Sequence, residues 1–300
     1  MNTKINLAGV ELKNPVMTAS GTFGSGMEYS EFVDLNKLGA VVTKGVANVP
    51  WPGNPTPRIA ETYGGMINAI GLQNPGIDVF CERDIPFLKK YDTKIIVNVC
   101  GKSERDYVEV VERLAGEPVD MLEINISCPN VKEGGIAFGQ NAANIEHITK
   151  AIKNVAKQPV IMKLSPNVTD ITEMAKAAEA GGADVLSLIN TITGMKIDIN
   201  RQTFAVANKT GGLSGPAVKP VAVRMVYQVA NAVKIPIIGM GGIATAEDAL
   251  EFILPPHPQL SIGTANFHNP RTTLEVIEGI EKYMVNKGVS DINDLIGIVK

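Results

Sequence analysis

The chain has 300 residues and a formal net charge of −3, which argues against nucleic acid or an anionic membrane surface as a partner. Hydrophobic residues make up 45% and aromatic residues 5%. This composition favours a core of Val, Ile, Leu and Ala, as expected where helices cover a parallel sheet. No apolar run approaches the ~18 residues that a membrane span needs, and the first residues lack a signal-peptide core, so we expect a cytoplasmic protein.

Short apolar runs alternate with helical patterns along the chain. Eight runs predict strands, at residues 16–19, 40–43, 95–99, 121–125, 160–164, 185–189, 235–239 and 260–263. Helical patterns follow most of them, at residues 103–114, 144–156, 170–180, 218–232 and 245–252. Eight strand–helix units favour a parallel (β/α)8 TIM barrel, formed by residues 1–300 as a single domain. An open Rossmann sheet is the alternative, but Gly21, Gly24 and Gly26 lack the dinucleotide-binding spacing.

Three segments are too long to be simple turns, at residues 47–75, 129–141 and 191–216. Each follows a predicted strand, so all three should lie on the top face of the barrel, where the carboxyl ends of the strands meet. Long loops in compact domains are usually functional. We therefore expect the site on this face.

Polar residues or glycines follow seven of the eight predicted strands. They are Lys44, Asn98, Asn125, Ser127, Cys128, Lys163, Ser165, Asn190, Thr191, Gly241, Gly242, Gly263 and Thr264. One such residue is more often part of a turn than a ligand-binding group. Agreement at seven ends instead favours an active site, because these ends face the site in TIM barrels.

The glycines after the last two strands suggest a phosphate site, in which backbone N–H groups approach the anion closely. An ordinary strand–helix turn also favours glycine, but two adjacent loops carry the same signal.

Lys44 and Lys163 lie at or just after the carboxyl ends of strands, which meet at the same end of the barrel. Either lysine could form a Schiff base or could hold negative charge on a ligand, and the sequence does not separate these roles.

Three cysteines are present, Cys81, Cys100 and Cys128, and none forms a C-x-x-C pair. We therefore expect no disulfide framework, zinc site or iron–sulfur cluster on this chain. Cys81 and Cys100 fit the usual role of a small buried hydrophobe. Cys128 differs because it lies beyond a strand end, before a glycine-bearing segment that could close over a ligand. It is the residue that we would most readily assign a catalytic role.

Three stretches resemble class 1 dihydroorotate dehydrogenase: Asn-Ile-Ser-Cys-Pro-Asn at residues 125–130, Asn-Ala-Ile-Gly-Leu-Gln-Asn-Pro at 68–75, and Gly-Leu-Ser-Gly-Pro at 212–216. The similarity covers nearly the whole chain. That family is a barrel with bound FMN that oxidises dihydroorotate to orotate in pyrimidine synthesis. The resemblance implies that Cys128 is the active-site base, and we expect no metal in the site.

The resemblance also implies binding roles for residues at matching positions. Substrate contacts are implied for Lys44, Asn68, Ala69, Ile70, Gly71, Leu72, Asn125, Asn190 and Thr191. FMN contacts are implied for Ser20, Lys44, Gly45, Asn98, Asn125, Lys163, Ile189, Gly215, Gly241, Gly242, Gly263 and Thr264. Lys163 would stabilise negative charge on the reduced flavin.

The segments at residues 131–135 and 190–198 resemble class 1B, whose barrels form a homodimer within a heterotetramer. There, a partner subunit with FAD and a [2Fe-2S] cluster passes electrons to NAD. A class 1A homodimer that uses fumarate, a non-flavin phosphate-binding lyase that uses Lys163, and a binding protein with a vestigial site are the alternatives. One stretch departs from the family pattern, with Pro255, Pro256 and Pro258 around His257, and puts the start of the last strand in doubt.

Overall fold

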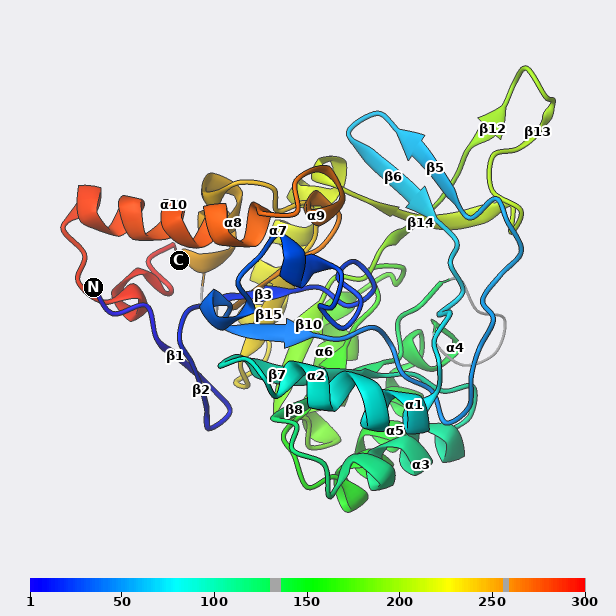
Figure 1. Ribbon diagram of the computed structural model, residues 1–300, viewed down its shortest axis with the longest axis horizontal. Coiled ribbons are helices and arrows are strands. Elements are labelled where there is room, and N and C mark those ends of the chain that lie inside the picture. Colours follow the sequence, from blue (N-terminus) through cyan, green and yellow to red (C-terminus); the bar gives the residue numbers. More distant parts are fainter. Residues whose placement is uncertain (130–135, 256–258, 300) are drawn as a thin grey trace.

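The computed structural model describes residues 1–129, 136–255 and 259–299. Eight central strands are β3 (Val16–Thr18), β4 (Ala40–Val42), β7 (Lys94–Val99), β8 (Met121–Asn125), β9 (Val160–Lys163), β10 (Val185–Leu188), β15 (Ile237–Met240) and β16 (Gln259–Ile262). They are all parallel and close into a barrel in the order β10, β15, β16, β3, β4, β7, β8, β9 (Figure 1). Each lies where the sequence predicts a strand, so the predicted TIM barrel is confirmed.

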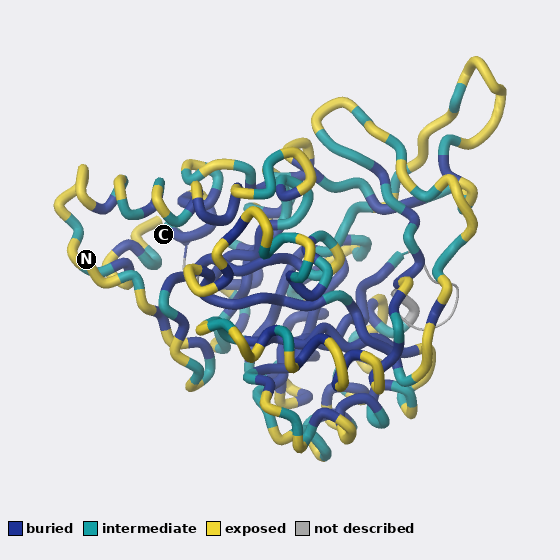
Figure 2. The backbone as a smooth tube through the Cα atoms, in the orientation of Figure 1, coloured by how far each residue is buried: buried dark blue, intermediate teal, exposed yellow. Residues whose placement is uncertain are grey.

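The barrel strands form the core because one face points inward and the other lies under helices. Nearly all of their residues are buried (Figure 2). The main covering helices are α3 (Glu104–Leu114), α5 (Ala142–Val155), α6 (Ile171–Ala180), α7 (Lys219–Ala230), α8 (Ala246–Ile253) and α10 (Thr272–Lys287). Ser103 and Thr245 begin α3 and α8 with reciprocal capping bonds to Asp106 and Asp248, which fixes where these helices start.

Short helices connect several of the main elements. Between β4 and β7 the chain forms α1 (Ile77–Val79), the π-helical turn η3 (Phe80–Asp84) and α2 (Ile85–Leu88). The other short helices are η1 (Tyr29–Glu31), η2 (Leu35–Lys37), α4 (Ile136–Gly139), η4 (Pro216–Val218), α9 (Ala265–His268) and η5 (Ile292–Leu295). Among the described residues, no helix is long and apolar enough to cross a membrane.

The two ends of the chain lie together beside a hairpin of β1 (Ile5–Leu7) and β2 (Val10–Leu12) (Figure 1). The amide N–H of Asn2 donates to the carbonyl oxygen of Ser290, at 2.8 Å. Of the proline-rich stretch, residues 256–258 lie outside the described part. Strand β16 starts at Gln259 and pairs with both neighbours, so the prolines do not disturb closure of the barrel.

Two of the three long top-face segments contain strands that the sequence does not predict. Strands β5 (Ile59–Thr62), β6 (Gly65–Asn68), β11 (Ile192–Met195) and β14 (Thr210–Ser214) form an antiparallel sheet in the order β11, β14, β6, β5. A separate hairpin pairs β12 (Ile197–Asp198) with β13 (Thr203–Phe204). The β6–β14 pairing joins segments that lie far apart in the chain, so no local pattern reveals it. The tips of the β5–β6 hairpin and of the β12–β13 hairpin project from the barrel and are exposed (Figure 2).

Candidate active site

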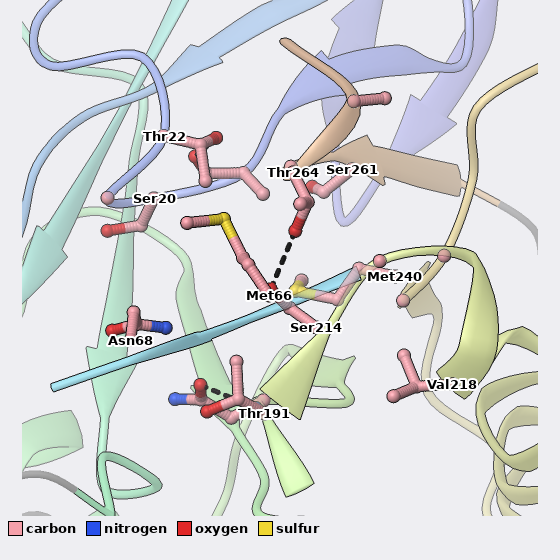
Figure 3. Close-up of a pocket in the computed structure, with 18 of the residues that line it drawn as sticks. Ser20, Thr22, Met66, Asn68, Thr191, Ser214, Val218, Met240, Ser261 and Thr264 are labelled. Carbon is pink, nitrogen blue, oxygen red and sulfur yellow. Dashed lines mark hydrogen bonds between the residues drawn. The ribbon is translucent and has the colours of Figure 1, made fainter. Parts of the chain in front are cut away.

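A cavity of about 650 Å³ opens at the carboxyl ends of the barrel strands. Its lining includes residues at or just after seven of the eight strands, and β6 and β14 of the antiparallel sheet supply further walls. In Figure 3, Ser20 and Thr22 after β3, Asn68 of β6 and Thr264 after β16 surround the cavity from different elements. This volume is within the usual range for a small-molecule or cofactor site.

Most of the predicted site residues line this cavity. They are Ser20, Lys44, Asn68, Ile70, Gly71, Leu72, Asn125, Cys128, Lys163, Ile189, Asn190, Thr191, Gly215, Gly241, Gly242, Gly263 and Thr264. Ala69, Gly45 and Asn98 are not in its lining. Ala69 packs with Ile67 and Val206, while Asn98 lies beneath the lining, fully buried in the barrel.

Cys128 follows β8 and is 6% exposed, at the boundary between the cavity and a small apolar cluster. The cluster also contains Ala47, Trp51, Leu72 and Cys100. The structure places none of the chain's three cysteines in a disulfide. The predicted lid falls largely on residues 130–135, outside the described residues. The placement of Cys128 gives its thiol access to a bound ligand from one side of the cavity.

Lys44, just after β4, and Lys163, at the end of β9, both line the cavity, and β7 and β8 lie between their strands in the barrel. Burial lowers the pKa of Lys44, and the charge of Lys163 adds to this effect, whereas Cys128 and Cys100 oppose it. The Nζ atom of Lys163 lies 3.6 Å from a carboxylate oxygen of Glu123. An ion-paired ammonium has no free electron pair for attack on a carbonyl, so this contact favours charge-holding over Schiff-base chemistry for Lys163.

A buried hydrogen-bond network underlies this part of the cavity. The Glu123 carboxylate accepts from Asn98 Nδ2 at 2.6 Å and from Ser187 Oγ at 2.8 Å. Asn125 Nδ2 donates to Asn98 Oδ1 at 3.3 Å, and Ser127 Oγ donates to Asn125 Oδ1 at 3.0 Å. Neither Glu123 nor Ser187 is among the predicted site residues. The signal available for Glu123 was a carboxylate in the middle of an otherwise apolar strand.

The opposite side of the cavity is built from backbone. Gly215, Gly241 and Gly242 have φ angles of +104°, +126° and +80°, which favour glycine. A Cβ atom on Gly242 would lie 2.7 Å from the Cβ of Lys219, so a side chain there has no room. Thr264 Oγ1 donates to Ser214 Oγ at 2.8 Å (Figure 3).

These residues fit FMN. The glycines leave peptide groups open to a phosphate, and the lysines and amides across the cavity suit a polar, electron-accepting ring. Ser261 Oγ supports the fit because it is buried at the cavity and has no hydrogen-bond partner in the described part of the chain. Among the described residues, no group of three His, Cys, Asp or Glu side chains could hold a metal ion.

Comparison with known proteins gives the family. Residues 2–284 match the model of the family described as dihydroorotate dehydrogenase. The chain is 75% identical to the "Dihydroorotate dehydrogenase B (NAD(+)), catalytic subunit" of Lachnoclostridium phytofermentans over the full length of both, and 65% identical to the protein of that name in Alkaliphilus oremlandii, over 99% of this chain and 98% of the relative. The fold is similar to that of DHODH from Eimeria tenella, solved in complex with ferulenol, with a TM-score of 0.83 and 24% identity over 99% of this chain and 88% of that one. The chain therefore belongs to the dihydroorotate dehydrogenase family.

Proposed function

We propose that this chain is the FMN-containing catalytic subunit of an NAD-linked dihydroorotate dehydrogenase, which oxidises dihydroorotate to orotate in pyrimidine biosynthesis. The observation that carries the proposal is that one cavity places Cys128, two lysines and a glycine-built backbone wall together. The relatives of the same name are similar over their whole length, which supports the same activity. Residues 1–300 would then act as one FMN-binding domain, in the cytoplasm.

FMN would be held by residues from both sides of the cavity: Ser20, Lys44, Gly45, Asn98, Asn125, Lys163, Ile189, Gly215, Gly241, Gly242, Gly263 and Thr264. The bound flavin supplies the acceptor for the hydride that leaves C6 of the substrate. The Lys163 ammonium would face the negative charge of the reduced ring. Gly45 would act indirectly, since a Cβ there would lie 2.9 Å from Asn98 Oδ1 and would displace that amide.

Cys128 would remove the proton from C5 of dihydroorotate. The thiolate takes this proton. The electron pair of the broken C5–H bond becomes the second bond between C5 and C6 as the hydride leaves C6. The apolar cluster around Cys128 excludes water from the back of the thiol, so the proton is exchanged on the cavity side. The position of Cys128 in the lining of the cavity supports this role.

The substrate would be held by Lys44, Asn68, Ile70, Gly71, Leu72, Asn125, Asn190 and Thr191, with Ala69 supporting the same loop. The Lys44 ammonium suits the carboxylate, and the asparagines supply donors and acceptors for a ring with alternating N–H and C=O groups. Asn68 belongs to β6 and is held against β14 by a hydrogen bond from its Nδ2 to the carbonyl oxygen of Gly212, at 3.4 Å. The antiparallel sheet thus positions one of the substrate-binding amides.

Electrons would leave through a partner subunit that carries FAD and a [2Fe-2S] cluster and reduces NAD. Two barrels would pair within a heterotetramer. The names of the relatives support this arrangement over the fumarate-dependent class 1A alternative. Co-expression with a candidate iron–sulfur partner tests it: we expect NAD reduction only in the complex. Direct fumarate reduction by the isolated barrel would contradict the assignment.

Visible spectroscopy of the purified chain tests the proposed activity. We expect a flavin spectrum that bleaches on anaerobic addition of dihydroorotate, with release of orotate. A protein that stays colourless after incubation with FMN would contradict the proposal. Trapping of a substrate on Lys163 by borohydride would instead favour the Schiff-base lyase.

A further inference from the structure

Glu123 is a carboxylate inside the barrel, only 1% exposed. It lies in the middle of β8, and Asn125, two residues later on the same strand face, reaches the cavity. Burial of a carboxylate costs several kcal/mol unless it is paired and hydrogen-bonded. An apolar side chain would fill this position without that cost, so the presence of Glu123 calls for a reason beyond packing.

The hydrogen bonds that lead to Glu123 all run in one direction. The Thr191 N–H donates to Asn190 Oδ1 at 2.7 Å, and Asn190 Nδ2 donates to Ser127 Oγ at 2.8 Å. From there, Ser127 donates to Asn125, Asn125 donates to Asn98, and Asn98 donates to Glu123. Each donor points toward the carboxylate. The network therefore starts at the cavity wall and ends at the one member that can only accept.

This direction follows from the chemistry of its end point. An ionised carboxylate has no hydrogen to donate, so Asn98 must present its Nδ2 to Glu123. Asn98 Oδ1 then faces Asn125, which must present its own Nδ2. Asn125 Oδ1 accepts from the N–H and Oγ of Ser127, at 3.3 and 3.0 Å. Within the described residues, one N–H of Asn125 has no acceptor and both lone pairs of its Oδ1 are used, so Asn125 faces the cavity as a donor.

We propose that Glu123 is a positioning residue that fixes the donor direction of the Asn98–Asn125–Ser127–Asn190 network and thereby sets Asn125 to recognise an acceptor atom on the substrate, such as a ring carbonyl oxygen. The inference rests on the proposed function, because it names what part of that substrate the site reads. Glu123 itself is not among the residues that line the cavity, so it acts through the residues that it holds.

The isosteric Glu123→Gln substitution tests this role. The glutamine amide can face Asn98 with either its oxygen or its nitrogen, so the direction of the network is no longer fixed. We expect orotate, titrated calorimetrically into the FMN-loaded protein, to bind about 10- to 100-fold more weakly, the usual cost of a mismatched buried hydrogen bond. The KM for dihydroorotate should rise more than kcat falls.

The sign of the effect separates direction from charge. Removal of a carboxylate beneath a site for an anion makes the potential there more positive and should tighten orotate binding. Weaker binding therefore cannot arise from the change in electrostatic potential at the site. Glu278→Gln is the matched control, because it removes the same charge from an exposed position on α10 and should leave orotate affinity unchanged.

The exchange variant Glu123→Gln with Asn98→Asp provides a rescue. The glutamine amide introduced on β8 can donate to the carboxylate introduced on β7, and that carboxylate still accepts from Asn125 Nδ2. The donor direction of the hydrogen bonds between Asn125 and the cavity wall is therefore restored, and the side chains keep their sizes. Because Asn98 is also one of the proposed FMN contacts, affinity is measured on the FMN-loaded fraction, where we expect the exchange to recover orotate binding to within about tenfold of the wild-type value. If Glu123→Gln loses FMN or fails to fold, recovery of folded, FMN-loaded protein by the exchange supports the proposal in the same way.

The inference would be overturned by Glu123→Gln protein that binds orotate as tightly as the wild type or more tightly. An exchange variant that binds orotate no better than the single variant would overturn it as well, as would failure of both variants to fold. The proposed function fails separately: it is refuted if the wild-type protein itself binds neither FMN nor orotate.

Discussion

The cavity has two walls that are built in opposite ways. The charged wall consists of side chains at or just after neighbouring strands, namely Lys44, Asn125, Cys128 and Lys163, with Asn98 and Glu123 buried behind them. The glycine wall consists of backbone after β14, β15 and β16, namely Gly215, Gly241, Gly242 and Gly263. The charged wall can distinguish donors, acceptors and charges, so it suits the reacting rings. The glycine wall offers only peptide groups and space, so it suits a phosphate.

Cys128→Ala should give the largest effect and should act on the charged wall alone. We expect dihydroorotate oxidation to fall by about 10²- to 10⁴-fold, the usual contribution of a general base, while FMN stays bound. Anaerobic stopped-flow measurement of flavin bleaching by dihydroorotate reports this step.

Cys100→Ala is the matched control for Cys128. Cys100 is fully buried in the same apolar cluster but does not line the cavity, and burial raises the pKa of its thiol. Its removal should leave bleaching nearly as fast as in the wild type. Equal loss in both variants, or loss of FMN in Cys128→Ala, would show that the cluster acts through packing and that Cys128 is not the base.

Gly242→Ala should break the glycine wall and leave the charged wall intact. The φ of +80° disfavours alanine, and the new Cβ would lie 2.7 Å from Lys219 Cβ and 2.9 Å from the Gly215 carbonyl oxygen. Strain of this kind is worth roughly 1–3 kcal/mol, so we expect FMN affinity to fall about 10- to 100-fold. FMN fluorescence titration of the apoprotein measures it.

Gly116→Ala controls for the general cost of replacing glycine, because Gly116 is exposed and its Cβ would meet open space. It should bind FMN normally. The fraction of Gly242→Ala protein that is saturated with FMN should bind orotate with near wild-type affinity. A large loss of orotate affinity in that fraction would mean that the two walls are not independent.

The walls also differ in how far they could be predicted from the sequence. Strand–helix alternation and the polar residues at strand ends predict the barrel and its working face, because both patterns are local. Gly241, Gly242 and Gly263 are recognisable for the same reason. The hydrogen bonds behind the charged wall could not be predicted in this way. Glu123 accepts from Ser187 of β10, 64 residues away, and only closure of the barrel brings the two side chains together.

The antiparallel sheet over the cavity shows the same limit. β6 and β14 contain glycine and polar residues that indicate a loop when each is considered alone. Their pairing depends on barrel closure, which brings the segments after β4 and β10 to one mouth. Gly212 allows this pairing at the cavity, because a Cβ there would clash with the Thr191 side chain.

The pH dependence of orotate binding should report on Lys44. Its pKa is below the ordinary value of 10.5, mainly because of burial. If the ammonium form holds the orotate carboxylate as proposed, affinity should be full well below the Lys44 pKa and should fall as pH rises through it, by up to about tenfold per pH unit. Isothermal titration at a series of pH values measures this.

Two variants assign the alkaline loss of affinity to Lys44. In Lys44→Arg the side chain stays charged, so affinity should be flat over the same range. In Cys128→Ala the negative charge of the ionised cysteine, which raises the Lys44 pKa, is gone, so the loss should begin at lower pH than in the wild type. A loss that is unchanged in Lys44→Arg would assign the titration to another group.

Ser261→Ala should give the smallest effect, and its sign should depend on whether FMN is bound. Ser261 Oγ is buried on the glycine side and has no partner within the described chain, so its removal should stabilise the apoprotein by roughly 1 kcal/mol, or ~2 °C in Tm. If the hydroxyl donates to bound FMN, the same variant should bind FMN about two- to tenfold more weakly. The FMN-induced rise in Tm should therefore shrink.

Thr273→Val is the matched control for Ser261. Thr273 Oγ1 is also buried without a partner in the described residues, but Thr273 does not line the cavity. Its replacement should raise the Tm of apoprotein and FMN-loaded protein equally. If Ser261→Ala behaves in that same way, the hydroxyl plays no part in binding, and the glycine wall holds the phosphate through its backbone alone.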